Sequence, residues 1–246
     1  MTRNLKTKQI IEQRDALEGP PNNIEPINLL LTDPPYGTGK TQTQQSNAYY
    51  DSAEIGATIE SIVRWMPAMH PNGTIAIICD YRLAPHITTA IIDNGWSYRG
   101  EIIWTFGLGR PRTNWWPVRH NNILTFTRTP TSGQFNRTAI PKEPRRAPKP
   151  GYPSDKPAGS VWDYTMSNTD PERVGYPNQK PLAIIEPIVL VHTNPNDLIA
   201  DPFIGSGTTA NAAKRNNRNF YGCDTNPEAV AIATQRLSKL ETHKLF

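Results

Sequence analysis

Residues 201–210 read DPFIGSGTTA and match the pattern G-x-G-x-x-A between a predicted strand, Leu198–Ala200, and a predicted helix. Glycines in such a turn allow the backbone to approach a ligand closely. Asp224 stands at the end of the next predicted strand, where a carboxylate can bind ribose hydroxyls. The pattern therefore predicts a site for a nucleoside cofactor; the alternative is a tight turn followed by a solvated Asp224.

The position of this loop excludes two other nucleotide-binding folds. Only 22 residues follow Asp224, whereas a nicotinamide-type fold begins with this fingerprint and continues with several more strands. The other half of the sheet must therefore come from upstream. A P-loop is excluded as well, because residues 205–207 lack its lysine and because Pro34 stands where GKT at 39–41 would need a first glycine.

Short apolar strands alternate with helical patterns along the rest of the chain. Such alternation is typical of an α/β domain with a twisted, mostly parallel sheet and helices on both faces. The expected strands cover residues 27–31, 74–79, 101–106, 122–127, 198–200 and 219–223, and the expected helices cover 55–66, 82–94, 181–192, 208–216 and 227–240. Pro187 should kink the helix that contains it.

A second loop, Asp33-Pro34-Pro35-Tyr36, follows the predicted strand at residues 27–31 and belongs at the carboxyl edge of the sheet, where such sheets bind ligands. Its two prolines make the loop rigid. The Asp33 carboxylate and the Pro34 carbonyl can each accept an N–H bond from a planar amino group, while Tyr36 stacks on the ring that carries it. The alternative is a capped β-turn with a buried tyrosine.

Charge and proline are unevenly distributed. The net charge is +4, but residues 110–150 contain nine basic residues against one acid, which is +8, so the remainder carries −4. A local basic excess is typical of a surface that binds a polyanion; the alternative is a solvated basic loop. Six of the 24 prolines lie in residues 141–157, which indicates an extended loop or linker there.

The composition indicates a soluble protein with a sizeable core. Apolar residues make up 37% of the 246 residues, which argues against disorder over most of the chain. No stretch approaches the roughly 18 apolar residues of a membrane-spanning helix, and Met1–Gln9 leads into no signal-like segment. Cys79 and Cys223 stand alone, so neither a metal site nor a disulfide framework is expected. We therefore expect a cytoplasmic protein.

The order of these motifs resembles that of a known family. The DPPY loop comes first, a variable basic segment next, then Asn178-Gln179-Lys180-Pro181, and finally DPFIGSGTT and FYGCD. This order is similar to that of the amino-group DNA methyltransferases of permuted, β-type order, in which the catalytic half precedes the cofactor half. YPNQKPL at residues 176–182 resembles that family's HPTQKPL, and QIIEQRDAL at 9–17 resembles its strand ending in GDAL, with Arg14 in place of glycine.

The resemblance covers nearly the whole chain outside roughly 128–175 and implies a Rossmann-like, seven-stranded-type sheet that binds S-adenosylmethionine. It implies that Asp201 and Phe203 flank the methionine moiety and that Lys180 and Thr208 reach its carboxylate. Asp224 would hold the ribose and Asp15 would touch the adenine. The cofactor-binding residues implied in this way are Asp15, Lys180, Pro181, Asp201, Phe203, Gly205, Ser206, Gly207, Thr208 and Asp224.

The expected reaction is direct methyl transfer to an exocyclic amine. Such an amine is a poor nucleophile, because its lone pair is delocalised into the ring. Two acceptors in the DPPY loop pull its N–H groups out of plane and counter the positive charge that develops on nitrogen. The expected catalytic residues are therefore Asp33, Pro34, Pro35 and Tyr36, acting on adenine N6 of a base flipped out of duplex DNA. The chain lacks a Pro-Cys nucleophile, which argues against methylation of a cytosine ring carbon.

We divide the chain into a catalytic half at residues 1–127, a target-recognition insert at 128–175 and a cofactor half at 176–246. The insert is short, which implies either a short recognition site or a homodimer. Arginine and lysine suit phosphates and guanines. The expected DNA-binding residues are Arg110, Arg112, Arg119, Arg137, Arg145, Arg146 and Lys149.

Three other functions are compatible with parts of this pattern. The same loop can methylate cytosine N4, but family members of that kind more often begin it with serine, so Asp33 favours adenine. A catalytically inactive DNA-binding relative would not need intact Asp33 and Asp224. RNA and protein amide methyltransferases usually place the cofactor motif first.

Overall fold

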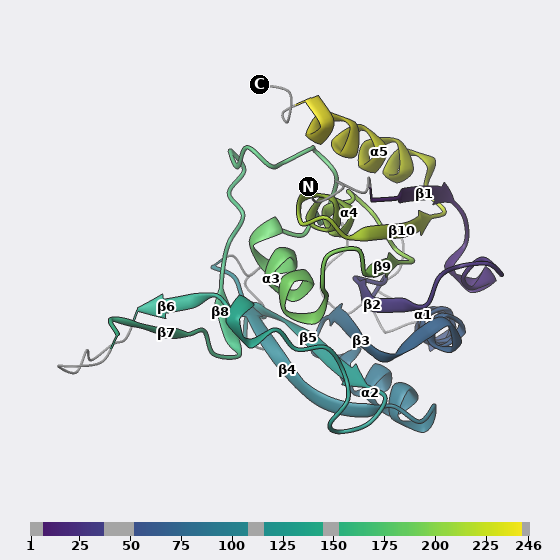
Figure 1. The fold of residues 1–246 in the computed structure, drawn as a ribbon, viewed down its shortest axis with the longest axis horizontal. Coiled ribbons are helices and arrows are strands. Elements are labelled where there is room, and N and C mark those ends of the chain that lie inside the picture. Colours follow the sequence, from purple (N-terminus) through teal and green to yellow (C-terminus); the bar gives the residue numbers. More distant parts are fainter. Residues whose placement is uncertain (1–6, 37–51, 108–115, 145–152, 243–246) are drawn as a thin grey trace, which may run out of the picture.

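The computed structural model describes residues 7–36, 52–107, 116–144 and 153–242. Within these ranges the main sheet has eight strands in the spatial order β1-β10-β9-β2-β3-β5-β4-β8 (Figure 1). All pairs are parallel except those of β5, which runs antiparallel to β3 and β4. The strands are β1 (Gln9–Gln13), β2 (Ile27–Thr32), β3 (Met69–Cys79), β4 (Ser97–Thr105), β5 (His120–Thr127), β8 (Val161–Asp163), β9 (Leu198–Asp201) and β10 (Asn219–Asp224). The expected mostly parallel sheet is thus confirmed.

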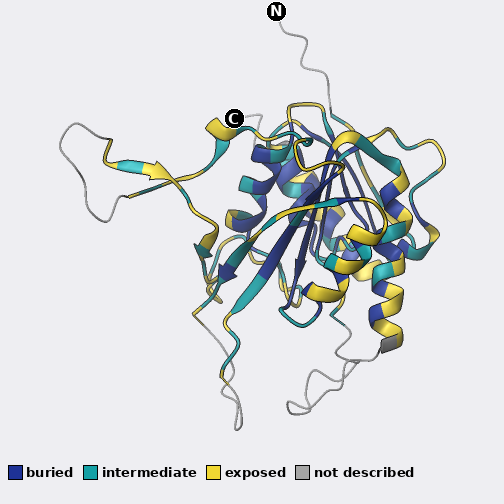
Figure 2. Cartoon of the chain, turned by 90° about the horizontal axis from the view of Figure 1, so that it is seen from below, coloured by how far each residue is buried: buried dark blue, intermediate teal, exposed yellow. Residues whose placement is uncertain are grey.

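Helices cover both faces of this sheet. Alternate residues of β3 point to opposite faces, so Ile75 and Ile77 join one apolar core and Ala76 and Ile78 join the other. The first core includes α1 (Ser52–Trp65) and α2 (Ala84–Asp93), and the second includes α3 (Leu182–His192), α4 (Thr208–Arg215) and α5 (Pro227–Thr242). Figure 2 shows the buried strands between helices whose outer surfaces are exposed. No helix among the described residues is both long and apolar enough to cross a membrane.

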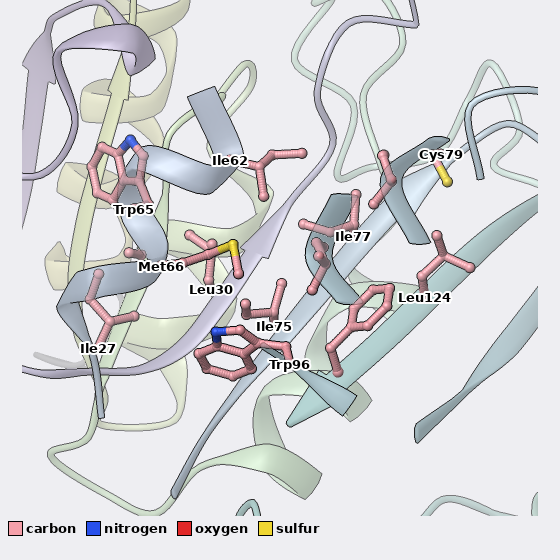
Figure 3. Packing of buried hydrophobic residues seen from close by; sticks show 14 of the residues in the cluster. Ile27, Leu30, Ile62, Trp65, Met66, Ile75, Ile77, Cys79, Trp96 and Leu124 are labelled. Atoms are coloured by element: carbon pink, nitrogen blue, oxygen red, sulfur yellow. The ribbon is translucent and has the colours of Figure 1, made fainter. Parts of the chain in front are cut away.

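Trp65 is the largest fully buried side chain of the first core and fixes the end of α1 (Figure 3). Its indole N–H donates to the carbonyl of Ala16, at 3.0 Å, in the short 3-10 helix η1 (Ala16–Glu18). Its ring centroid lies 5.7 Å from that of Tyr221 in β10. Pro67 stands within the next 3-10 helix, η2 (Met66–Ala68), where it ends α1 as expected. Trp65 therefore holds α1, η1 and the sheet together.

The segment predicted as an insert contributes to the body as well as to a projection. Residues 142–144 (β6, Lys142–Pro144) and 155–157 (β7, Asp155–Pro157) form a two-stranded antiparallel arm that extends away from the body (Figure 1). The following strand, β8, instead pairs with β4 in the main sheet. The other seven strands of the main sheet agree with the seven-stranded type that the resemblance implies, and β8 adds an edge strand that is too short to show periodicity in the sequence.

The two halves of the chain meet where β2 lies beside β9. Leu29 pairs with Ile199 and Leu30 with Ala200, in parallel register. Just beyond this pairing, the buried hydroxyl of Thr32 donates to Oδ1 of Asp201 at 2.7 Å. The loops that follow β2 and β9 therefore begin side by side at the carboxyl edge of the sheet. Burial raises the pKa of Asp201 to about 6, although the hydrogen bonds from Thr32, Thr209 and the Phe203 N–H oppose the rise.

This buried carboxylate predicts a pH-dependent stability. Between pH 4 and 6 the folded chain keeps a proton on Asp201 that the unfolded chain loses, so raising the pH through this window lowers the free energy of unfolding, by up to about 3 kcal/mol. Asp201→Asn removes this loss and keeps an acceptor for Thr32. Denaturant unfolding at a series of pH values should show the variant gaining stability relative to wild type as the pH rises from 4 to 7.

The exposed Asp93 at the end of α2 offers the control variant Asp93→Asn, which removes a carboxylate from the surface. Parallel stability curves for wild type and Asp201→Asn would contradict a raised pKa at Asp201.

Candidate active site

A cleft of about 1,200 Å³ opens at the carboxyl edge of the sheet, across the β2–β9 junction. Its lining includes the DPPY loop after β2, the glycine loop after β9 and residues 164–180, which precede α3, together with residues of α1 and residues 224–228. Aromatic side chains also contribute from the ends of β4 and β8, on the DPPY side. The residues relevant to binding include Asp15, Asp33, Pro34, Pro35, Tyr36, Trp104, Phe106, Tyr164, Tyr176, Lys180, Asp201, Phe203, Gly205, Ser206, Thr208, Asp224 and Glu228.

The DPPY loop places a carboxylate and a phenol together. The Tyr36 hydroxyl donates to Oδ1 of Asp33 at 2.6 Å, and the Lys180 ammonium contacts Oδ2 of the same carboxylate. The Thr58 hydroxyl of α1 donates to the Pro35 carbonyl at 3.2 Å, which ties the loop to the helix that Trp65 anchors. Burial, reinforced by the neighbouring Asp33 charge, raises the pKa of Tyr36 well above its usual value. Tyr36 therefore remains a neutral donor at physiological pH.

Aromatic residues form the wall of the cleft beside this loop. The ring centroids of Trp104 and Phe106 lie 5.6 Å apart, edge to face, and the Trp104 indole N–H donates to the Tyr164 carbonyl at 2.9 Å. Because β4 and β8 lie on the far side of β2 from β9, this wall belongs to the side of the cleft that carries the DPPY loop. Flat apolar walls and nearby acceptors suit a planar ring with an amino group.

Asp224, the last residue of β10, lies beside the glycine loop at the other end of the cleft. Oδ2 of Asp224 accepts from the Gly205 N–H at 3.0 Å and Oδ1 accepts from the Asn226 N–H at 2.9 Å. Gly205 and Gly207 have φ of 48° and 75°, which favour glycine. A Cβ on Gly207 would lie 2.6 Å from that of Ala233, so this glycine also allows α4 to pack against α5.

The chemistry of this end fits a nucleoside. Asp15, Asp224 and Glu228 supply carboxylate oxygens that can accept from ribose hydroxyls and an amino group, and Phe203 and Tyr176 add rings. Asp15 already caps η1, since its Oδ1 accepts from the Leu17 N–H at 2.9 Å, but its side chain still lines the cleft. These residues present the acceptors that a nucleoside cofactor requires. Within the described residues no His, Cys, Asp and Glu group is arranged to hold a metal ion.

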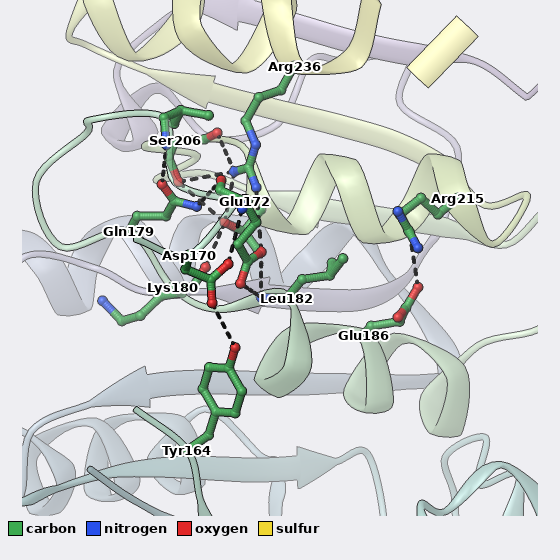
Figure 4. A network of polar contacts seen from close by, with 12 residues as sticks. Tyr164, Asp170, Glu172, Gln179, Lys180, Leu182, Glu186, Ser206, Arg215 and Arg236 are labelled. Carbon is green, nitrogen blue, oxygen red and sulfur yellow. Dashed lines mark hydrogen bonds and ion pairs between the residues drawn. The ribbon is translucent and has the colours of Figure 1, made fainter. Parts of the chain in front are cut away.

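A buried polar network, which the sequence analysis did not identify, joins the glycine loop to the segment before α3 (Figure 4). Nη1 of Arg236 donates to the Ser206 carbonyl at 2.8 Å and to the Thr208 hydroxyl at 3.1 Å, and Nη2 lies 3.8 Å from the Glu172 carboxylate. Glu172 accepts in turn from the Leu182 N–H at 3.1 Å. Arg236 is three residues after the inward-facing Ala233, so helical spacing could have identified it as inward-facing.

The remaining predicted cofactor residues hold the loops in place. Pro181 precedes α3 as its N-cap, and Ser206 is buried beside Arg236. The Thr208 hydroxyl donates to the Lys180 carbonyl at 2.9 Å, so this hydroxyl is engaged within the protein. The Phe203 side chain lines the cleft while its N–H donates to Asp201.

Two of the predicted DNA-binding residues, Arg119 and Arg137, lie within the described part of the chain, and the structure places them toward opposite edges of the sheet. Arg119 immediately precedes β5 and is exposed at the edge where the cleft opens, near Trp116, which is 80% exposed. Arg137 follows β5, in the 3-10 helix η3 (Arg137–Ala139) near the end of α3, toward the opposite edge of the sheet. Arg110, Arg112, Arg145, Arg146 and Lys149 lie outside the described residues.

Comparisons with known proteins agree with this geometry. Residues 27–235 match the model of the N6/N4 methyltransferase family, which is described as a DNA methylase family. The chain is 30% identical over 222 residues to the type II methyltransferase M.HpaI of Haemophilus parainfluenzae, covering 86% of this chain and 68% of that protein. It is 32% identical over 243 residues to M.BglII of Bacillus subtilis, covering 90% and 66%.

Solved structures share the fold. The crystal structure of the M1.HpyAVI-SAM complex superimposes with a TM-score of 0.69 and 28% identity, over 93% of this chain and 98% of that one. The cytosine-N4-specific PvuII DNA methyltransferase has a TM-score of 0.70 at 18% identity, over 94% and 86%, and so shows the fold alone. The family match spans both loops and the sheet between them, and the chain therefore belongs to the N6/N4 DNA methylase family.

Proposed function

We propose that this protein transfers a methyl group from S-adenosylmethionine to N6 of adenine in double-stranded DNA, as a methyltransferase of β-type order. The observation that carries the proposal is the single cleft that joins Asp33 and Tyr36 at one end to Asp224 and the glycine loop at the other. The type II methyltransferases among its relatives and the SAM complex of M1.HpyAVI support the reaction and the cofactor.

In this proposal, one end of the cleft binds the cofactor and the other end binds the target base. Bound S-adenosylmethionine supplies a sulfonium methyl group. At the other end, the Asp33 carboxylate accepts an N–H of the target and offsets the positive charge that develops on the attacking nitrogen. Trp104, Phe106 and Tyr36 provide flat surfaces for the base, which must leave the duplex to enter the cleft. Arg119, whose carbonyl accepts from the N–H of the cleft residue Phe106, is the candidate that we assign to a phosphate contact.

Adenine is the target that the loop favours. The resemblance associates an initial aspartate, here Asp33, with adenine more than with cytosine, whose enzymes more often carry serine there. YhdJ of Escherichia coli strain K12, named as a DNA adenine methyltransferase, is 26% identical over 226 residues. Cytosine N4 is the second candidate, because the same loop can hold the exocyclic amine of cytosine.

Sequencing of modified bases tests the proposal directly. DNA from cells that lack other methyltransferases should carry N6-methyladenine at a fixed sequence when wild-type protein is expressed. Cells expressing Asp33→Ala should carry none. Finding N4-methylcytosine instead would show that the target is cytosine and not adenine. Finding unmodified DNA, together with purified protein that does not bind S-adenosylmethionine, would contradict the proposed function.

Replacing Asp33 should separate catalysis from cofactor binding. In Asp33→Ala we expect methyl transfer to fall by at least about 10²-fold, since an acceptor for the developing charge is lost. The dissociation constant for S-adenosylmethionine, measured by calorimetry, should not rise by more than a few-fold. Lost cofactor binding would instead identify Asp33 as a structural cap or a cofactor ligand.

Replacing Asp224 should have the converse effect. Asp224→Ala should weaken S-adenosylmethionine by about 1 to 3 kcal/mol, because ribose hydroxyls lose their acceptor and the Gly205 N–H loses its partner. Asp224→Asn keeps one acceptor for Gly205 and should lie between wild type and Asp224→Ala. Unchanged affinity in both variants, measured by calorimetry, would contradict the ribose assignment.

A further inference from the structure

Lys180 extends from the segment before α3 to the catalytic loop. Its ammonium contacts Oδ2 of Asp33, and lies 5.9 Å from the centroid of the Tyr36 ring. The side chains are largely buried, with 13% of Lys180 and 24% of Asp33 exposed. Because Tyr36 donates to Oδ1, both oxygens of the Asp33 carboxylate are engaged by other residues of the protein.

This pairing opposes the role of Asp33 in methyl transfer. The target nitrogen gains positive charge as it attacks, so the carboxylate stabilises the transition state through its own negative charge. An ammonium in contact with that carboxylate cancels most of the charge and repels the developing cation, and partial burial strengthens both effects. The arrangement that promotes the reaction must therefore have the Lys180 ammonium farther from Asp33.

The backbone of Lys180 is fixed, so the change is confined to its side chain. The Thr208 hydroxyl donates to the Lys180 carbonyl at 2.9 Å. On either side, Gln179 donates to the Glu172 carbonyl at 2.9 Å and the Leu182 N–H donates to the Glu172 carboxylate (Figure 4). The flexible side chain therefore pivots from a point held beside the glycine loop. Its ammonium also donates to the Asn178 carbonyl at 3.3 Å, so an alternative partner is already in reach.

We propose that Lys180 is a positioning residue that couples the two ends of the cleft: an anionic group in the cofactor end draws its ammonium from Asp33, and thereby frees Asp33 for the target amine. The inference rests on the proposed function, in which that anionic group is the carboxylate of the cofactor's amino-acid moiety. Coupling of this kind is reciprocal, so cofactor and target should each strengthen binding of the other.

The test compares two ligands that differ in that carboxylate. S-adenosylhomocysteine carries it, whereas 5′-methylthioadenosine keeps the nucleoside and lacks the amino-acid moiety. With the duplex identified by sequencing, S-adenosylhomocysteine should tighten binding of the target site by about 10-fold in wild type, within the usual range of coupled sites. 5′-Methylthioadenosine should not tighten it. In Lys180→Met, duplex affinity should be the same with either ligand or none.

Lys8→Met is the matched control, since Lys8 pairs only loosely with Glu25 at 3.8 Å on the surface. It should keep the 10-fold effect. A second measurement needs no DNA. It records the ¹³C NMR signals of the lysine ε-carbons in wild type, and the Lys180 signal is assigned as the one that is missing in Lys180→Arg. S-adenosylhomocysteine should shift the Lys180 signal, and 5′-methylthioadenosine should leave it in place.

The outcomes distinguish this inference from the proposed function. If S-adenosylhomocysteine does not bind and DNA is not methylated, the proposed function fails. If it binds and DNA is methylated, but the 10-fold effect persists in Lys180→Met or the Lys180 signal does not respond to the carboxylate, Lys180 does not couple the two ends. If Lys180→Met does not fold, the ¹³C comparison in wild type alone decides.

Discussion

The pairing of β2 with β9 is the constraint on which the site depends. These strands belong to opposite halves of the chain, and their parallel register brings Thr32 to Asp201 at the same edge of the sheet. β2 is followed by the DPPY loop and β9 by the glycine loop. Because both loops leave a common edge of the sheet, ligands bound at the two loops can meet in one cleft without any movement of the sheet.

Much of the fold and the two loops at the ends of the cleft could be predicted from the sequence, whereas the aromatic wall of the cleft could not. Buried strands such as Leu198–Asp201 are short apolar runs bounded by turns, and the DPPY and glycine loops have distinctive residues at fixed spacing. β8 could not be predicted, because three residues cannot show a period and its pairing with β4 is a long-range contact. Glu172 and Arg236 were missed for a related reason: each is partnered through the tertiary fold, 64 residues apart in sequence.

Polar contacts within the cleft serve the fold and the chemistry together. Asp224 holds the Gly205 N–H that shapes the glycine loop, and Asp15 caps η1, although both carboxylates line the cleft. Thr208 is held between Arg236 and the Lys180 carbonyl. Side chains that are already hydrogen-bonded to the backbone lose little conformational freedom when a ligand arrives, so the glycine-loop end of the cleft is preorganised for a ligand. The side chain of Lys180 instead contacts Asp33 in the DPPY loop.

The arm formed by β6 and β7 leaves the body between two firm attachments. Before it, the Asn136 N–H donates to the Val191 carbonyl at 2.7 Å, and its side-chain amide donates to Leu190 and Thr193. After it, the Ser160 carbonyl accepts from the Ile103 N–H at 2.8 Å, where β8 joins the sheet. Because the chain is anchored in this way on both sides of the arm, the arm can change without displacing the strands and helices next to it. The arm can therefore be lengthened, shortened or replaced while Trp104, Phe106 and Tyr164 keep their positions in the aromatic wall.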